Sequence, residues 1–252
     1  MTDFVQPVRR RGTLGRQQTK GAAALVRYNG ANKPPKRTRQ REKRMRIVIF
    51  DMDGTLIDSQ QDIACSINHV RAVNHALPPV ESGLIVDWIN RPVRNLPKLF
   101  YGTETYESRD RDLFETHYHE QCVQNPVLYP GIKETLEGLK GRGVRLAVAT
   151  NAPSIFARRM IAHLDVERYF EHIVGPDIAG ASKPDPAMLY RILGAAGYEA
   201  AKHRAWMVGD NSKDIDAARA AGITGVFSTW GFSPEGSGDI VISRPQSLLD
   251  IV

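Results

Sequence analysis

The chain has 252 residues, of which 42% are hydrophobic and 25% are charged, a composition that is ordinary for a globular protein. No apolar run approaches the ~20 residues that a membrane-spanning helix needs, and the two cysteines, Cys65 and Cys122, are too few for a disulfide framework. We therefore exclude membrane-spanning and disulfide-stapled classes, and we expect a cytoplasmic protein without a signal peptide.

The positive charge of the chain is concentrated in residues 1–44. This segment holds 13 lysines and arginines against 2 acidic residues, a balance of +11, whereas residues 45–252 hold 21 against 26, a balance of −5. Its few apolar residues cannot offset the entropy cost of ordering it, so a disordered basic extension is predicted. It could be a solvated or untranslated extension ahead of Met45, an arm that binds nucleic acid or another acidic partner, or a transit peptide, although it contains no serine.

Residues 46–50 are predicted to form a buried strand of a parallel sheet, and two carboxylates, Asp51 and Asp53, follow it. Side chains two residues apart leave a strand on the same side, and Gly54 permits a tight turn. Ligands of open α/β sheets bind at the carboxyl ends of strands, and close carboxylates repel unless a cation or proton lies between them. Such oxygen ligands suit Mg²⁺, although the pair by itself could also be an acidic loop without a ligand.

The rest of the chain alternates predicted helices and strands, which indicates a parallel sheet with helices on both faces. Helices are predicted at 59–76, with Ser59 as N-cap, and at 132–141, 154–164, 185–196 and 214–221. Further strands are predicted at 144–149, 173–174, 205–208 and 225–228. Residues 62–128 show no strand alternation and are predicted to be helices joined by loops, which interrupt the pattern as a cap over an active site would. The predicted core then comprises residues 45–61 and 129–252.

Polar side chains lie at the predicted carboxyl ends of three strands and in one loop between them. They are Asp51 and Asp53, Thr150 and Asn151, Lys183, and Asp210 with Asp214. Singly, each has an ordinary explanation, such as a strand-end hydroxyl, a surface lysine, a helix N-cap or an exposed acid in a first helical turn. Together, the carboxylates could hold Mg²⁺ while a hydroxyl, an ammonium and loop N–H groups hold phosphoryl oxygens. The pattern therefore favours a site that processes phosphate groups.

Four segments resemble the four motifs of the haloacid dehalogenase-like superfamily. They are Asp51-Met52-Asp53-Gly54-Thr55, Ala149-Thr150-Asn151, Ser182-Lys183-Pro184-Asp185-Pro186 and Val208-Gly209-Asp210-Asn211-Ser212-Lys213-Asp214-Ile215. The insertion between the first and second motifs resembles the branch with an α-helical cap, and Tyr129-Pro130-Gly131 resembles its phosphoglycolate phosphatase-like members. The resemblance implies an α/β fold, with a Rossmann-like parallel sheet core, helices on both faces and an inserted α-helical cap domain.

By this resemblance Asp51 would be the nucleophile that forms an aspartyl-phosphate, and Asp53 would be the general acid and base. Thr150, Asn151 and Lys183 would bind the phosphoryl group. The Mg²⁺ ligands implied are Asp51, Asp53, Asp210 and Asp214.

The resemblance implies a Mg²⁺-dependent phosphatase of a small phosphorylated metabolite, similar to phosphoglycolate. An acid at Asp53 favours a phosphate ester, because a dehalogenase has no alkoxide leaving group to protonate. A sugar phosphomutase of the same superfamily is one alternative, and a nucleic-acid-associated protein that acts through residues 1–44 is another. Arg91 and Arg94 could recognise an anionic substrate end or belong to a solvated helix face. No membrane partner is expected, and the sequence leaves the ester and the oligomeric state open.

Overall fold

The computed structural model describes residues 44–91 and 94–252. Residues 1–42 are grouped separately from Lys43–Val252, and only the latter unit is described below. The predictions made for the basic extension fall on residues 1–43 and lie outside the described part of the chain. Within the described part, none of the helices has the length and apolar character required to cross a bilayer.

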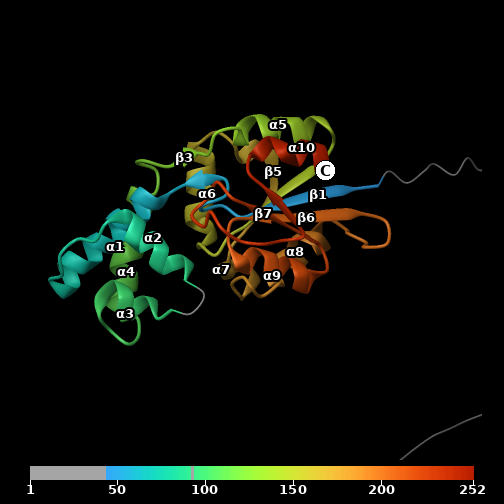
Figure 1. Ribbon diagram of the computed structural model, residues 1–252. Coiled ribbons are helices and arrows are strands. Elements are labelled where there is room, and N and C mark those ends of the chain that lie inside the picture. The colour runs from blue at the N-terminus through green and yellow to red at the C-terminus, as the bar shows by residue number, and fades with distance from the viewer. Residues whose placement is uncertain (1–43, 92–93) are drawn as a thin grey trace, which may run out of the picture. The chain divides into compact units, whose positions relative to one another are not determined.

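Six parallel strands form the central sheet (Figure 1). In spatial order they are β5 (Phe170–Val174), β4 (Arg145–Ala149), β1 (Arg46–Phe50), β6 (Arg204–Gly209), β7 (Thr224–Ser228) and β8 (Ile240–Ile242). Strand β1 pairs with β4 on one side and β6 on the other, with Phe50 opposite Val148 and Val208. The carboxyl ends of these three strands are therefore neighbours, although their segments are far apart in the sequence.

Helices cover both faces of the sheet (Figure 1). They are α5 (Ile132–Gly141), α6 (Ser154–His163), α7 (Pro176–Ala179), α8 (Ala187–Ala195), α9 (Ser212–Ala221) and α10 (Leu248–Ile251), with short 3-10 helices at Glu167–Tyr169 and Pro245–Ser247. Alternate residues of β1 face opposite layers, because strand side chains alternate in direction. Val48 and Phe50 join a core cluster with residues of α5, α6 and α10, whereas Ile47 and Ile49 join one with residues of α8 and α9.

Four helices follow the first strand and its turn. A short antiparallel pair, β2 (Ile57–Asp58) and β3 (Val127–Leu128), lies at the two ends of this insertion. The helices are α1 (Gln60–His75), α2 (Ser82–Asn90), α3 (Leu96–Tyr101) and α4 (Ser108–Gln121). They bury their own apolar cluster, which includes Ile67, Val70 and Phe100.

Hydrogen bonds join the two ends of the insertion to each other and also tie the insertion to the core. The buried carboxylate of Asp62 accepts hydrogen bonds from Gln121 Nε2 at 2.8 Å and from the backbone N–H and side-chain amide of Asn125 at 3.1 and 2.8 Å, so it joins the two connecting segments. Farther away, Asn211 Nδ2 at the start of α9 donates to Asn90 Oδ1 at the end of α2, at 3.0 Å.

The structure confirms the predicted α/β class and corrects several element boundaries. Strand β8 was not predicted, because three residues at a sheet edge carry little periodic signal. Strand β5 begins at Phe170 and not at residue 173, since it is the opposite edge strand and includes the polar Glu171 and His172. Helix α7 was also missed, and α9 begins at Ser212 with Asn211 as its cap. Ser59 occupies the N-cap position of α1, but its side chain does not cap the helix.

Candidate active site

The predicted site residues gather at the carboxyl ends of β1, β4 and β6. Asp51, Thr150 and Asp210 each follow the last residue of one of these strands, and all three are buried. The capping box at the start of α9, in which Asn211 N–H donates to Asp214 Oδ2 at 3.1 Å, holds Asp214 beside them. The parallel register thus brings together residues that are 163 positions apart in the sequence, between Asp51 and Asp214.

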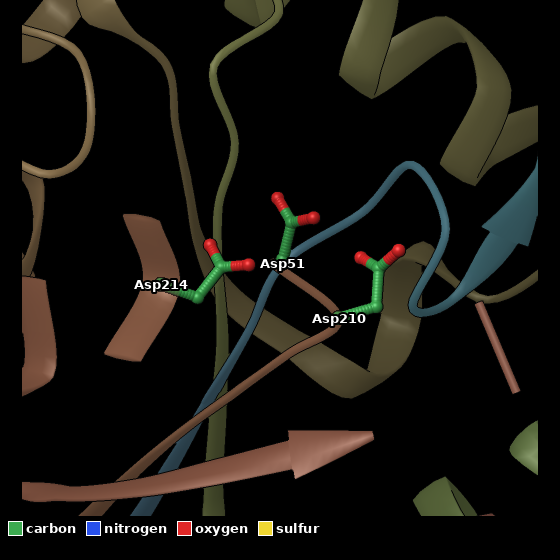
Figure 2. A group of neighbouring side chains, drawn as sticks. All are labelled: Asp51, Asp210 and Asp214. Atoms are coloured by element: carbon green, nitrogen blue, oxygen red, sulfur yellow. The ribbon is translucent and has the colours of Figure 1, made fainter. Parts of the chain in front are cut away.

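Asp51, Asp210 and Asp214 form a group of buried carboxylates (Figure 2). One oxygen of each lies within 4.8 Å of one oxygen of each of the others. Burial raises the pKa of Asp210 and of Asp214, and the neighbouring Asp51 carboxylate raises both further. Hard oxygen donors crowded in this way are suited to a Mg²⁺ ion, which relieves their repulsion. The three carboxylates and the Lys183 ammonium together carry a formal charge of −2, which a divalent cation would neutralise.

Two glycines leave the space that these carboxylates occupy. A Cβ atom on Gly54 would lie 2.4 Å from Asp210 Oδ2, and the positive φ of +86° also favours glycine there. A Cβ atom on Gly209 would lie 2.2 Å from Asp214 Oδ2. Both positions therefore need glycine because the carboxylates pack directly against the backbone.

Lys183 reaches into the centre of the carboxylate group. Its Nζ lies 2.6 Å from Asp51 Oδ1 and 2.6 Å from Asp214 Oδ1, and it donates to the backbone carbonyl of Ala149 at 2.7 Å. Burial alone would lower the pKa of this ammonium, but the Asp214 and Asp51 carboxylates hold its pKa above the usual value. Lys183 is therefore charged and neutralises part of the carboxylate group.

Asn151 holds the backbone of Lys183. Asn151 Oδ1 accepts from the Lys183 backbone N–H at 2.8 Å, and Asn151 Nδ2 donates to the Lys183 carbonyl at 3.0 Å. These two hydrogen bonds fix the side chain of Asn151 against Lys183 and use one of the two hydrogens on Nδ2. Among the described residues, the hydroxyl of Thr150 accepts from the Ala152 N–H at 3.1 Å and has no acceptor for its own hydrogen, which it can therefore donate.

Asp53 lies near Asp51, and its side chain is held by Ser59, the residue that precedes α1. Its Oδ1 accepts a hydrogen bond of 2.5 Å from the Ser59 hydroxyl. Burial raises the pKa of Asp53 to about 7; the Ser59 hydrogen bond opposes this shift and Asp51 adds to it. A carboxyl group with such a pKa is protonated in a large fraction of molecules near neutral pH, as a general acid must be.

Asp210 is oriented by groups from two other segments. Thr55 Oγ1 donates to Asp210 Oδ1 at 3.1 Å, and the Phe232 N–H donates to Asp210 Oδ2 at 2.7 Å. Trp230 Nε1 donates to the Thr55 carbonyl at 3.0 Å and so joins the same turn to the loop after β7. The role of Phe232 could not be predicted, because a backbone donor leaves no signature in the sequence.

A cavity of about 760 Å³ opens over these residues and extends between the core and the helical insertion. Its lining includes all seven predicted core residues, Asp51, Asp53, Thr150, Asn151, Lys183, Asp210 and Asp214. Arg94 also lines the cavity, but Arg91 does not. The guanidinium of Arg91 instead pairs with Asp87 of α2 at 2.6 Å. The structure thus separates the two arginines that the sequence analysis had grouped.

Lys213 was missed as a site residue, although it lies within the fourth motif. It lines the cavity, and burial, together with the nearby Arg94, lowers its pKa to about 8. Within the described residues neither Lys213 nor Arg94 forms an ion pair with a carboxylate. The one feature of the sequence that could have indicated this role is the positive charge of Lys213 directly before Asp214.

Comparison with known proteins agrees with this arrangement. The family model described as haloacid dehalogenase-like hydrolase matches residues 48–227. The chain belongs to this family. Within the haloacid dehalogenase-like hydrolases it is 35% identical over 198 residues to a phosphoglycolate phosphatase from Haemophilus influenzae, covering 75% of this chain and 87% of the relative.

Two further relatives match over most of their length. A phosphoglycolate phosphatase from Aquifex aeolicus is 33% identical over 210 residues, which cover 82% of this chain and 97% of the relative. The crystal structure of a predicted phosphoglycolate phosphatase from Haemophilus somnus superposes with a TM-score of 0.70 at 27% identity, covering 82% of this chain and 97% of that one. The similarity therefore includes the helical insertion as well as the sheet.

Proposed function

We propose that this haloacid dehalogenase-like hydrolase is a Mg²⁺-dependent phosphatase that cleaves a small phosphate monoester, similar to phosphoglycolate, through an aspartyl-phosphate. The observation that carries the proposal is the position of Asp51, which lines the cavity together with Asp210 and Asp214 and lies 2.6 Å from the Lys183 ammonium. A nucleophile placed among a cation and metal ligands suits attack on a phosphoryl group, whose negative oxygens need compensation.

In the first step, one oxygen of Asp51 would attack phosphorus as the bond from phosphorus to the ester oxygen breaks. Asp53 would give its proton to the departing oxygen, and its pKa of about 7 suits this transfer. Thr150 and Lys183 would donate hydrogen bonds to the phosphoryl oxygens. In the second step, Asp53 would take a proton from water as that water attacks phosphorus, and inorganic phosphate would leave with Asp51 regenerated.

The residues that would hold Mg²⁺ are Asp51, Asp210 and Asp214, together with the backbone carbonyl of Asp53. When bound, the cation would offset the negative charge of the phosphoryl group and of the carboxylates. Thr55 and the Phe232 N–H would keep Asp210 oriented for this role.

We also propose that residues 62–128 act as a cap domain over the core formed by residues 45–61 and 129–252. Arg94 from the insertion and Lys213 from the core line the cavity, and both lack carboxylate partners among the described residues. They would attract the anionic end of a substrate such as the phosphoglycolate in the names of the relatives.

The proposal is tested by a phosphate-release screen over small phosphate esters with Mg²⁺, with phosphoglycolate included and Asp51→Asn as the negative control. Release of phosphate that requires Mg²⁺ and Asp51 is expected. Conversion of a hexose phosphate into an isomeric sugar phosphate without release of phosphate would instead identify a phosphomutase. A salt-dependent shift of nucleic acid in a gel, lost on deletion of residues 1–44 from a protein inactive on every ester, would favour the nucleic-acid alternative.

A further inference from the structure

Asp110, in the first turn of α4, is the one carboxylate of the helical insertion among the described residues that line the cavity. The residue is 1% exposed. Its Oδ1 accepts from Asn74 Nδ2 at 2.8 Å and lies 2.8 Å from His75 Nε2, so it ties the end of α1 to the start of α4. Its Oδ2 is buried and has no hydrogen-bond partner within the described part of the chain.

This unpartnered oxygen is unusual, because nearly all buried polar atoms in folded proteins have a partner. The tie between α1 and α4 uses only Oδ1, so it does not explain why this cavity-lining residue carries a second, buried acceptor. The surroundings offer little solvation, since Phe114, Phe100 and Ile67 line the same cavity. A bound molecule that brings a hydrogen-bond donor would satisfy Oδ2 and remove the cost of its burial.

We propose that Asp110 is a specificity-determining residue that accepts a hydrogen bond from a hydroxyl or ammonium group on the leaving group of the substrate. The inference rests on the proposed phosphatase function and refines it. Asp51 and Asp110 line one cavity, the first from the core and the second from the insertion, so one ester could contact both. Glycolate carries no such donor beyond the oxygen that leaves, so a hydroxylated or aminated ester should be a better substrate than phosphoglycolate.

The test compares esters that differ only in the donor. Glycerol 1-phosphate is paired with propyl phosphate, and phosphoethanolamine with ethyl phosphate; the two pairs distinguish a hydroxyl from an ammonium donor. The wild-type protein with Mg²⁺ should favour the donor-bearing member of at least one pair by ~10–100-fold in kcat/KM, as expected for a hydrogen bond to a charged acceptor. Phosphoglycolate, tested alongside, should fall below the favoured ester.

Asp110→Asn is the decisive variant, because the amide keeps an oxygen for Asn74 and His75 but replaces the second acceptor with a donor. In this variant the ratio of kcat/KM between the donor-bearing ester and its partner should fall to ~3-fold or less. Asn74→Ala is the matched control: it removes a hydrogen bond to the same carboxylate from a residue that does not line the cavity, and it should retain the preference. A ratio between paired substrates is not moved by a general loss of cap stability.

Equal kcat/KM for both members of each pair in the wild-type protein would overturn the inference while leaving the phosphatase function intact, even if Asp110→Asn did not fold. If Asp110→Asn lowered kcat/KM by the same factor for both members of a pair, Asp110 would have only a structural role, and the inference would likewise be wrong. Absence of phosphate release from all four esters, from phosphoglycolate and from p-nitrophenyl phosphate would overturn the proposed function, and this inference with it.

Discussion

The two ends of the cavity differ in how their polar groups are paired. At the core end, Asp51, Asp210 and Asp214 each have protein partners, namely Lys183, Thr55 and the backbone of Asn211. At the insertion end, Asp110 Oδ2 lacks a partner within the described residues, and Arg94 donates to the Arg91 carbonyl at 2.6 Å but forms no ion pair with a described carboxylate. Groups held by the protein are preorganised for a reaction that many substrates share, whereas groups left open are available to choose among substrates.

The largest effect should come from the core end. Asp51→Asn would remove the proposed nucleophile and weaken a proposed metal ligand with little change in side-chain volume, so kcat should fall by ~10⁴-fold or more. Steady-state phosphate release and circular dichroism would measure activity and fold. Asp58→Asn is the control, because Asp58 lies on β2 outside the cavity lining and should retain activity. Activity of Asp51→Asn within tenfold of wild type would remove Asp51 from the reaction.

Asp53→Asn should separate the two acids of the first motif. The loss should be ~10²–10⁴-fold on an alkyl phosphate, because the leaving alkoxide needs a proton, and smaller on p-nitrophenyl phosphate, whose phenolate leaves without one. Comparing kcat for the two esters measures this difference, and Mg²⁺ affinity should change little. If both esters lose the same factor, Asp53 does not protonate the leaving group.

Gly209→Ala tests how tightly the core end is packed. The added Cβ would meet Asp214 at 2.2 Å, so the carboxylate must move, and a displacement of this size costs ~10²-fold in kcat/KM. The affinity for Mg²⁺, followed by titration of activity, should fall as well. Gly141→Ala places a Cβ at the end of α5 with no atom within 4 Å and should leave both quantities unchanged. Wild-type Mg²⁺ affinity in Gly209→Ala would argue against Asp214 as a ligand.

The smallest effect should come from the cations at the insertion end. Arg94→Ala should raise KM about tenfold for an ester with an anionic leaving group and change kcat little, since the loss is one of charge attraction in substrate binding. Added salt should shrink the difference between variant and wild type. Arg91→Ala is matched in chemistry but pairs with Asp87 outside the cavity, so its KM should equal that of wild type. Equal increases in KM for both variants would mean that the effect is not local.

The sequence was sufficient to predict the fold class and the residues that gather at the carboxyl ends of β1, β4 and β6, because these depend on local signals. Apolar runs such as residues 46–50 mark buried strands, and the acids, the hydroxyl and the lysine stand directly at strand ends or in the loop between them. The edge strand β8 and the helix α7 are too short to produce such a signal, so they became visible only in the structure.

Tertiary structure alone decided how side chains at similar sequence positions are used. Arg91 and Arg94 are three residues apart, yet only Arg94 lines the cavity, whereas Arg91 pairs with Asp87 on α2. Ser59 has the sequence position of an N-cap, but its hydroxyl donates to Asp53. In the sequence Asp110 is an ordinary acid of a first helical turn, and only the packing of α1 against α4 gives its carboxylate a partner. Such roles depend on which polar groups are buried next to one another, and this is determined by packing between segments that are far apart in the sequence.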